Sequence, residues 1–523
     1  MRPRKALIVD GYNDEPGGLG VPPYIDVYPR YIAGALWAAD KGVTVHYVTV
    51  DEFRSSGVWL KRASSYDVVF FVAGVVVPGK YIGGRPASAE ELALWASVIE
   101  GPLKVLTGPA ARWGIGLEGG RAAYPPSFFR GRGFDVLVTG DVEEYAYELA
   151  LHGEERASPH RVRESYANVD RFAVLGARIA RFHPNIGRNL VAEIETYRGC
   201  PRWVSGGCSF CVEPLRGRPI QRDPRSIVNE VRALYENGVR NFRLGRQADI
   251  LVYGADKLGE EEWPKPNPVA LERLFKGIRS EAPGLEVLHI DNVNPGTIAR
   301  YPRESEEALK VIVSYHTSGD VAALGIESVD PEVVKLNNLK VTFDEALFAV
   351  ELINKVGSQR GANGLPELLP GINFILGLPG ETAESYRINR EFLEEILRRR
   401  LLVRRVNVRR LLALEVTRVF RMDWGVKPKL EGHARAFLHY VRNVFDLRML
   451  SMVAPPGVVL RDLWVEECEL GYCYARQAGS YPLMVVIKGR FPRLHYIPSV
   501  VVRGVHSSRS LSGDPVSEGA PAP

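Results

Sequence analysis

The chain has 523 residues, of which 46% are hydrophobic and 25% charged, and its formal net charge is +5. These values are typical of a soluble globular protein of several domains, because single cores seldom exceed about 250–300 residues. No apolar run reaches the roughly 18 residues that a membrane-spanning helix needs, and the basic first residues precede an apolar stretch too short for a signal peptide. We therefore expect a cytoplasmic protein with no membrane partner. The mild charge permits an RNA partner without indicating one.

Residues that are chemically sensitive to heat are scarce, with only five methionines and five cysteines. Arginine runs at 398–400 and 404–405 add to this pattern. The pattern is typical of a thermophile protein, although GC-rich coding also replaces lysine by arginine.

Residues 1–150 contain five short apolar runs with helical patterns between several of them. The runs are Ala6–Val9, Thr44–Val48, Val68–Phe71, Leu103–Leu106 and Val136–Leu137. This alternation predicts a doubly wound, flavodoxin-like α/β domain with a parallel sheet. Asp10 and the glycine-rich stretch 17–20 follow the first run, at the carboxyl edge where such sheets bind ligands.

The polar stretch Arg161–Gly187 links this unit to a second α/β unit, predicted over residues 188–430. Its six strand-like runs are Val191–Thr196, Val239–Gly245, Leu285–Ile290, Val321–Gly325, Gly371–Gly377 and Leu401–Leu411. Six strands with right-handed helical crossovers predict an open, partial (β/α)6 barrel of the TIM-like kind. His289 and Asp291, two residues apart, are predicted to share a face.

Three cysteines, Cys200, Cys208 and Cys211, follow the first run of this unit. Thiolates are soft ligands that suit iron–sulfur centres or zinc, and three of them leave one coordination position open. Nearby glycines let the backbone wrap closely around a metal. Two other interpretations stay open: a zinc site completed by a distant ligand such as Cys468, Cys473 or a histidine, and three unrelated buried thiols.

The cysteines and the strand ends together resemble the radical SAM superfamily over residues 188–415. The segment Cys208-Ser-Phe-Cys211 matches the end of the family's cysteine motif, with Phe210 as the aromatic residue expected near the adenine. The first spacing departs from the family pattern, because seven residues rather than the usual three separate Cys200 from Cys208.

Three strand ends resemble the family's cofactor-binding motifs. The segment Gly245-Arg246-Gln247 lies where the family often has Gly-Gly-Glu, which binds the methionine amino group. Glu327 and Ser328 belong to a segment similar to the fourth-strand motif that contacts the ribose or the methionine. The turn Gly377-Leu378-Pro379 resembles that of the fifth strand, which packs against the adenine.

The resemblance implies a 4Fe-4S cluster held by the three cysteines, with S-adenosylmethionine on the fourth iron. One electron, from a donor of the ferredoxin or flavodoxin type, then leads to cleavage into methionine and a 5′-deoxyadenosyl radical. The barrel keeps the radical from water and directs it at one hydrogen atom of a substrate.

Within this superfamily, an amino-terminal flavodoxin-like domain resembles a cobalamin-binding module. The motif Asp-x-His-x-x-Gly is absent, and His46, the first histidine, lies inside a predicted strand. Cobalamin bound without a protein ligand to cobalt therefore stays an alternative, as does a scaffold that caps the barrel. Methylthiotransferases also carry an α/β domain there, with three further cysteines. No cysteine precedes Cys200, which disfavours sulfur insertion.

Closely spaced strand patterns between glycines predict a small OB-like β-barrel over residues 455–506. Its layout resembles the RNA-binding TRAM domain, and side chains such as Arg503 and Tyr474 offer charge and stacking surfaces. The odd number of cysteines argues against disulfides, so Cys468 and Cys473 are expected to be free hairpin thiols. The tail over residues 507–523 is predicted to be disordered.

The sequence thus predicts a radical SAM enzyme of undetermined substrate, with an RNA or tRNA base as the leading candidate. A cobalamin-dependent radical SAM methyltransferase is the first alternative. A metal-stabilised RNA-binding protein without redox chemistry is the second.

Overall fold

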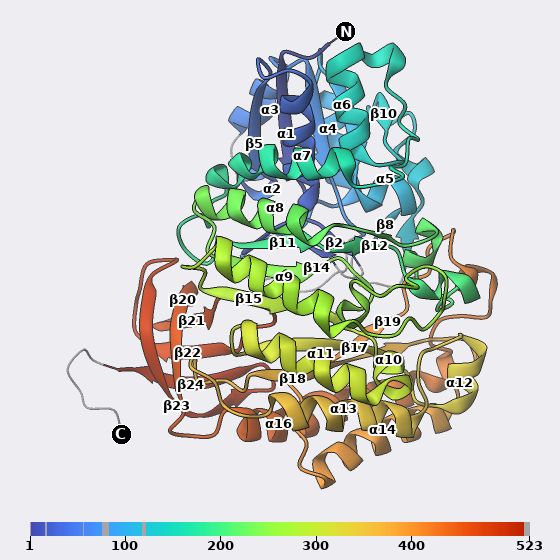
Figure 1. The fold of residues 1–523 in the computed structure, drawn as a ribbon, viewed down its shortest axis with the longest axis vertical. Coiled ribbons are helices and arrows are strands. Elements are labelled where there is room, and N and C mark those ends of the chain that lie inside the picture. Colours follow the sequence, from blue (N-terminus) through green and yellow to red (C-terminus); the bar gives the residue numbers. More distant parts are fainter. Residues whose placement is uncertain (1, 16–17, 56, 76–82, 118–121, 517–523) are drawn as a thin grey trace.

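The computed structural model describes the chain except for residues 1, 16–17, 56, 76–82, 118–121 and 517–523. An α/β unit, a central barrel and a carboxyl-terminal β-barrel follow one another along the chain (Figure 1). Gly17 of the glycine-rich stretch and the end of the predicted tail, 517–523, lie outside the described residues.

The amino-terminal unit is a parallel sheet with helices on both faces. Its strands are β1 (Lys5–Asp10), β5 (Thr44–Thr49), β6 (Val68–Val72), β7 (Leu103–Thr107) and β10 (Val136–Leu137). Their order is β10-β7-β6-β1-β5, the order of flavodoxin-like folds, which confirms the predicted architecture. The helices are α1 (Val27–Ala39) and α6 (Val142–His152) on one face, and α2 (Val50–Ser55), α3 (Gly57–Ala63), α4 (Ala89–Val98) and α5 (Pro109–Trp113) on the other.

Helix α1 crosses helix α7 (Ala167–Gly176) at two glycines. A β-carbon on Gly34 would lie 1.8 Å from the carbonyl oxygen of Phe172, and one on Gly176 would lie 1.8 Å from that of Arg30. Because the clashing atoms are backbone, we expect Gly34→Ala to lower the free energy of unfolding by about 2–3 kcal/mol. Chemical denaturation measures this, with Gly432→Ala as the control because its added β-carbon meets nothing within 4 Å. Equal stability of the two variants would contradict the close crossing.

The central unit has the six predicted parallel strands, and the third is broken in two. They are β11 (Val191–Glu195), β14 (Asn241–Gly245), β15 with β16 (Val287–Ile290 and Asn292–Val293), β17 (Asp320–Glu327), β18 (Leu368–Leu376) and β19 (Arg405–Arg410). β15 pairs with β14 and β16 with β17, so the third strand changes neighbours at Asp291. The carbonyl oxygen of Asp291 accepts a hydrogen bond of 2.9 Å from Ala323 N, which bridges the break.

Helices cover the outside of this barrel. They are α8 (Pro224–Glu236), α9 (Pro268–Glu281), α10 (Pro295–Arg300), α11 (Pro302–Tyr315), α12 (Pro331–Leu336), α13 (Phe343–Gly357) and α14 (Ala383–Arg398). The free edge of β11 pairs with β4 (Tyr24–Ile25) of the amino-terminal unit rather than with β19. The barrel is therefore open between β4 and β19, as six strands predict.

Alternate residues of the barrel strands face opposite sides. Ile194, Leu244 and Ile290 pack in the core beneath the helices. The residues that alternate with them along the strands face the barrel interior, which contains both charged and small side chains. This interior set includes Glu193, Glu195, Arg243, His289, Ala323, Gly325, Gly371 and Arg405.

The carboxyl-terminal unit, which follows helices α15 (Glu431–Tyr440) and α16 (Asp446–Val453), is a closed β-barrel. Its strands are β20 (Val459–Glu469), β21 (Tyr472–Gln477), β22 (Met484–Lys488), β23 (Tyr496–Ser507) and β24 (Ser510–Pro515). Strand β24 shows that the prediction of disorder from residue 507 was wrong up to Pro515. β24 pairs with both β22 and β23, and its Leu511 is fully buried. A barrel closes only when both edge strands have a partner, and pairing with β22 and β23 therefore keeps residues 510–515 ordered.

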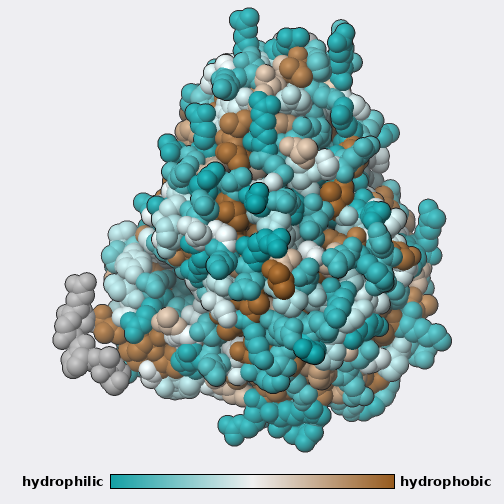
Figure 2. Space-filling model, viewed as in Figure 1, coloured by the Kyte–Doolittle hydropathy of each residue, from teal (hydrophilic) through white to brown (hydrophobic). Residues whose placement is uncertain are grey.

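The face of the molecule in Figure 2 is largely hydrophilic, with apolar side chains scattered among polar ones. Among the described residues, no helix has the length and apolarity that crossing a bilayer requires.

Candidate active site

The three cysteines of the predicted metal centre lie in one loop after strand β11. Cys200 begins a 3-10 turn over Pro201–Ser205, and Cys211 N donates to the carbonyl oxygen of Cys208 at 3.1 Å. Cys200 and Cys208 are only 9% and 7% exposed. Gly207, with φ of +64°, turns the chain, and a β-carbon there would lie 2.3 Å from Pro214 Cγ. The long first spacing thus folds back on itself, with its tight turn at Gly207 packed against Pro214.

Burial raises the pKa values of two of these thiols, Cys200 and Cys211, so both are protonated at neutral pH when no metal is bound. Burial, with a contribution from Cys208, raises the pKa of Cys200 to about 12. Burial, then the charges of Cys208 and Cys200, raise the pKa of Cys211 well above its usual value. A nucleophilic cysteine needs a lowered pKa, whereas a metal deprotonates its thiol ligands outright. The arrangement therefore fits metal ligands better than a free nucleophile.

The structure also bears on the zinc interpretation. Within the part of the chain that the structure describes, no three Cys, His, Asp or Glu side chains gather closely enough to surround a single ion. Cys468 and Cys473, which were candidates for a distant fourth ligand, are bonded to each other in the carboxyl-terminal barrel. The disulfide therefore removes Cys468 and Cys473 as ligands of a zinc ion at the cysteine loop.

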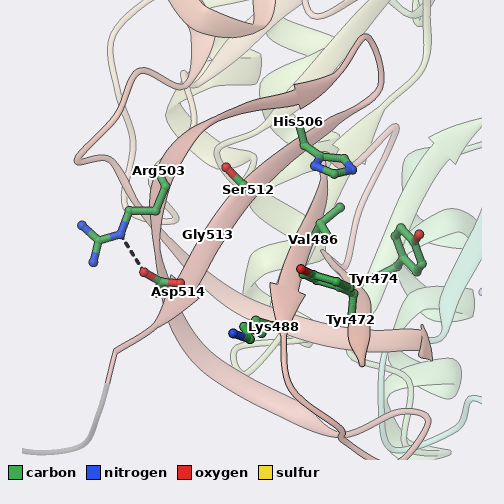
Figure 3. A pocket seen from close by; sticks show the side chains of 9 residues that line it. All are labelled: Tyr472, Tyr474, Val486, Lys488, Arg503, His506, Ser512, Gly513 and Asp514. Carbon is green, nitrogen blue, oxygen red and sulfur yellow. Dashed lines mark hydrogen bonds and ion pairs between the residues drawn. The ribbon is translucent and has the colours of Figure 1, made fainter. Parts of the chain in front are cut away.

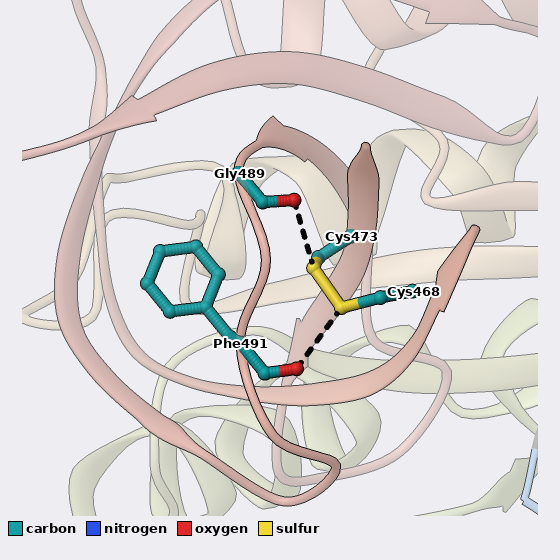
Figure 4. Close-up of a disulfide and its surroundings, with 4 residues drawn as sticks. All are labelled: Cys468, Cys473, Gly489 and Phe491. Carbon is teal, nitrogen blue, oxygen red and sulfur yellow. Dashed lines mark hydrogen bonds between the residues drawn. A yellow bond between two sulfur atoms is a disulfide. The ribbon is translucent and has the colours of Figure 1, made fainter. Parts of the chain in front are cut away.

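The Cys468–Cys473 disulfide shows that the prediction of two free thiols was wrong (Figure 4). The two residues face each other across strands β20 and β21, with Cα atoms 4.0 Å apart. Their sulfur atoms lie 3.2 and 3.5 Å from the carbonyl oxygens of Phe491 and Gly489. The register of the hairpin, rather than the number of cysteines, decides which thiols meet.

An apolar wall joins the cysteine loop to the turn after strand β18. Its members include Cys208, Phe210, Cys211, Val333, Leu339, Leu378, Leu411, Ala413 and Val419. Gly377 begins the turn with φ of +91°, and its N–H donates to Glu381 Oε2 at 2.8 Å. The carbonyl oxygen of Pro379 accepts from Asn337 Nδ2 at 2.8 Å. The fold thus brings together the two segments in which the sequence placed the adenine site.

The side chains of Arg246 and Gln247, which follow strand β14, form ion pairs and hydrogen bonds with other protein groups. Arg246, with φ of +61°, is buried and held by carboxylates on three sides. These are Glu15, Asp26 at 3.1 Å and Glu195 at 3.4 Å. Gln247 accepts from Thr196 Oγ1 at 3.2 Å and donates to the carbonyl oxygen of Leu244 at 2.8 Å. Because Glu15 and Asp26 belong to the amino-terminal unit, the ion pairs of Arg246 link that unit to the barrel.

The last residues of the fourth-strand motif point in different directions. Glu327, with φ of +68°, is buried inside the barrel. Burial raises its pKa to about 7, against the opposing effects of Lys340 and Arg409. Ser328 Oγ instead hydrogen-bonds Asn389 Oδ1 of helix α14 at 3.3 Å. The structure places Glu327 in the interior and Ser328 in the packing behind it.

Lys340 is a candidate functional residue that the sequence did not indicate. Its Nζ donates to the carbonyl oxygen of Gly325 at 2.8 Å. Burial disfavours the charged form, but the charges of Cys208 and Glu327 outweigh it and raise the pKa of Lys340. A single lysine between two helices has no motif around it, so its place beside the cysteines emerges only from the fold.

A loop of the carboxyl-terminal barrel, residues 479–481, fills the open side of the central barrel. Ser480 N donates to His289 Nδ1 at 2.8 Å, and the Tyr481 hydroxyl donates to Asp291 Oδ1 at 3.1 Å. On the β19 side, the guanidinium of Arg405 lies 4.3 Å from the centre of the Tyr481 ring. His289 and Asp291 therefore share a face, as predicted, and this face meets the loop that closes the interior.

A shallow hollow of about 320 Å³ lies on the carboxyl-terminal barrel itself (Figure 3). It is lined by Tyr472, Tyr474, Val486, Lys488, Arg503, His506, Ser512, Gly513 and Asp514. Arg503 pairs with Asp514 at 2.8 Å, and Tyr472 is 48% exposed. Aromatic and basic side chains in one hollow suit a planar ligand that carries negative charge.

Comparisons with known proteins agree with this geometry. A family model described as the Radical SAM superfamily matches residues 194–393. An uncharacterized protein of Methanocaldococcus jannaschii is 43% identical over 98% of this chain and 94% of its own length. The ribosomal protein uS12 methylthiotransferase RimO of Clostridioides difficile is 27% identical over 39% of this chain and 40% of its own.

Among solved structures, the radical S-adenosylmethionine methyltransferase TsrM of Kitasatospora setae, with cobalamin and a 4Fe-4S cluster bound, has a TM-score of 0.51. The match covers 80% of this chain and 74% of that chain at 16% identity, and it shows a shared fold. The family model matched over residues 194–393, with the cysteine loop, strands and turns in the expected order, shows that the chain belongs to the radical SAM superfamily, whose enzymes use a 4Fe-4S cluster and S-adenosylmethionine.

Proposed function

We propose that Cys200, Cys208 and Cys211 bind the 4Fe-4S cluster and that the barrel interior beside them binds S-adenosylmethionine. One observation carries this proposal: Cys208 and Cys211 lie in the apolar wall with Phe210, and the ammonium group of Lys340 is close enough to interact electrostatically with all three cysteines. When bound and reduced, the cluster supplies the electron that cleaves the cofactor into methionine and a 5′-deoxyadenosyl radical. The chain's part is to bind, to orient and to exclude water.

Each part of the cofactor has a group that suits it. Lys340 would bind the methionine carboxylate, because only one of its three N–H donors is used by Gly325. The apolar wall at Phe210 and Leu378 suits the adenine. Since the side chains of the segment 246–247 are engaged elsewhere, backbone groups at Gly245 are left for the methionine amino group.

The test is anaerobic reconstitution followed by reduction with dithionite in the presence of S-adenosylmethionine. We expect a brown protein with four irons per chain, and formation of 5′-deoxyadenosine and methionine. Reconstituted protein without iron and sulfide contradicts the cluster, and a full cluster without 5′-deoxyadenosine contradicts the cofactor chemistry. A colourless protein with one bound zinc would support a binding protein without redox chemistry.

For the substrate, we propose an RNA base. A relative over part of the chain, from Azobacteroides, is a tRNA-2-methylthio-N(6)-dimethylallyladenosine synthase. The hollow of the carboxyl-terminal barrel offers two tyrosine rings beside Lys488 and Arg503, which suits stacking of bases and contact with phosphates.

We expect Tyr474→Ala to weaken binding of a fluorescent single-stranded RNA by about fivefold to a hundredfold, since stacking on one base contributes about 1–3 kcal/mol. Fluorescence anisotropy measures this. Tyr496→Ala is the control, because Tyr496 is also partly exposed but hydrogen-bonds Asp462 and does not line the hollow. Equal binding by both variants would argue against the hollow as the RNA site.

Cobalamin is a second cofactor candidate, and one observation favours it. Asn13 Oδ1, Thr107 Oγ1 and Trp113 Nε1 are buried near the carboxyl edge of the amino-terminal sheet and, in the described structure, have no hydrogen-bond partner. These groups fit a ligand with many amide side chains, as the corrin ring has. His46 lies in strand β5, and its ring packs against that of Tyr66. We therefore propose that His46 does not ligate the cobalt. Equilibrium dialysis with hydroxocobalamin tests this, and retention no higher than by albumin would contradict it.

A further inference from the structure

Arg202 lies in the long segment between the first two cysteines and directs its guanidinium at a proposed cluster ligand. The side chain is 2% exposed, and its Nη1 lies 3.2 Å from Cys208 Sγ. An arginine is protonated at every accessible pH, so this contact brings a permanent positive charge to the sulfur.

The orientation of this guanidinium is fixed by three further contacts. Nε pairs with Glu262 Oε1 at 2.9 Å, and Nη2 donates to Asn338 Oδ1 at 3.0 Å. The guanidinium carbon lies 5.1 Å from the ring centre of Trp263. Because every side of the group has a partner, Nη1 cannot turn away from Cys208.

The extra length of the cysteine loop supports this arrangement. Seven residues stand between Cys200 and Cys208, and the additional ones reach the segment that carries Glu262. Trp203 Nε1 donates to the carbonyl oxygen of Gly259 at 3.1 Å, and Ser205 Oγ donates to Glu262 Oε1 at 2.8 Å. The departure from the usual spacing thus anchors the loop to the groups that orient Arg202.

We propose that Arg202 donates a charge-assisted hydrogen bond to the thiolate of Cys208 and thereby raises the reduction potential of the cluster. Hydrogen bonds to the sulfurs and the net charge nearby set such potentials. One electron enters on reduction and no proton moves, so a fixed cation stabilises the more negative, reduced state. The inference rests on the cluster proposed above, but not on the identity of the substrate.

The experiment is a redox titration of the reconstituted protein, followed by electron paramagnetic resonance of the reduced cluster. At the midpoint potential of the wild type, Arg202→Gln is expected to show an about tenfold lower ratio of reduced to oxidised cluster, equivalent to about 59 mV for one electron. Glu262→Gln is expected to shift the midpoint in the opposite direction, because it removes the charge that partly neutralises Arg202.

Iron and sulfide per chain are measured first in each variant. Midpoints that stay at the wild-type value, or that move in the same direction in both variants, overturn the proposal and leave Arg202 a structural residue. If Arg202→Gln assembles no cluster, Glu262→Gln carries the test and must shift the midpoint to a higher potential, whereas Arg202→Lys, which keeps the positive charge, should stay close to the wild-type value; an unmoved or lowered midpoint in Glu262→Gln then overturns the proposal. Absence of iron from the wild type contradicts the proposed function, whereas a full cluster with unmoved midpoints contradicts this inference alone.

Discussion

The Cys211→Ala variant is expected to lose the visible iron–sulfur absorbance and to form no detectable 5′-deoxyadenosine under dithionite. With one thiolate removed, two remain for a cluster that needs three protein ligands in this superfamily. Cys211 lies in the apolar wall beside Cys208, and the other cysteines outside the loop, Cys468 and Cys473, are bonded to each other, so neither can replace the missing thiolate. Iron and sulfide analysis, absorbance spectra and chromatography of the reaction products measure the effect.

The matched control is the double variant Cys468→Ser with Cys473→Ser. It removes two sulfurs from the chain, but they belong to a disulfide of the carboxyl-terminal barrel rather than to the cysteine loop. Cluster content and 5′-deoxyadenosine formation should stay at the wild-type level. Retained activity in Cys211→Ala, or equal losses in the control, would refute the assignment of the ligands.

The second large effect is expected from Lys340→Met, which should weaken S-adenosylmethionine binding by about 10- to 100-fold while the cluster remains complete. The variant keeps the length of the side chain but removes the ammonium group, and a hydrogen bond to a charged group contributes about 1.5–3 kcal/mol. The raised pKa of Lys340 means that the wild type carries this charge at neutral pH. Equilibrium binding to the oxidised, reconstituted protein measures the change without any turnover.

Lys335→Met is the matched control, because Lys335 is exposed on helix α12, a few residues away. Its dissociation constant should equal that of the wild type. A Lys340→Met variant with unchanged affinity would show that another group binds the carboxylate. A loss of iron in that variant would assign Lys340 to the stability of the cysteine loop.

Much of the fold could be predicted from the sequence because its signals are local. Apolar runs such as Val68–Phe71 become central strands since their neighbours on both faces are helices. The turn at Gly377 needs a positive φ, which glycine adopts without strain, so the glycine indicates this turn in the sequence. The carboxyl-terminal barrel was predicted from its glycine spacing, but its last strand was missed because Ser510–Pro515 is rich in small and polar residues.

The site was predicted only in part, because only some of its residues lie close together in the sequence. Cys200, Cys208 and Cys211 lie within twelve residues, so their grouping needs no knowledge of the fold. Glu262 reaches the cysteine loop, and Lys340 and the loop 479–481 reach the barrel interior, all from distant segments whose contacts leave no periodic pattern in the sequence. Two of the three carboxylates around Arg246, those of Glu15 and Asp26, come from the amino-terminal unit, so this arginine links the two units through ion pairs.

The sequence by itself determined the order of strands and helices and the place of the cysteine loop, since both follow from patterns between near neighbours. The tertiary structure alone decided which charges surround that loop and which cysteines pair. It also decided how the open side of the barrel is closed. Contacts between residues far apart in the chain depend on the packing of whole units, and a single sequence carries no periodic signal for them.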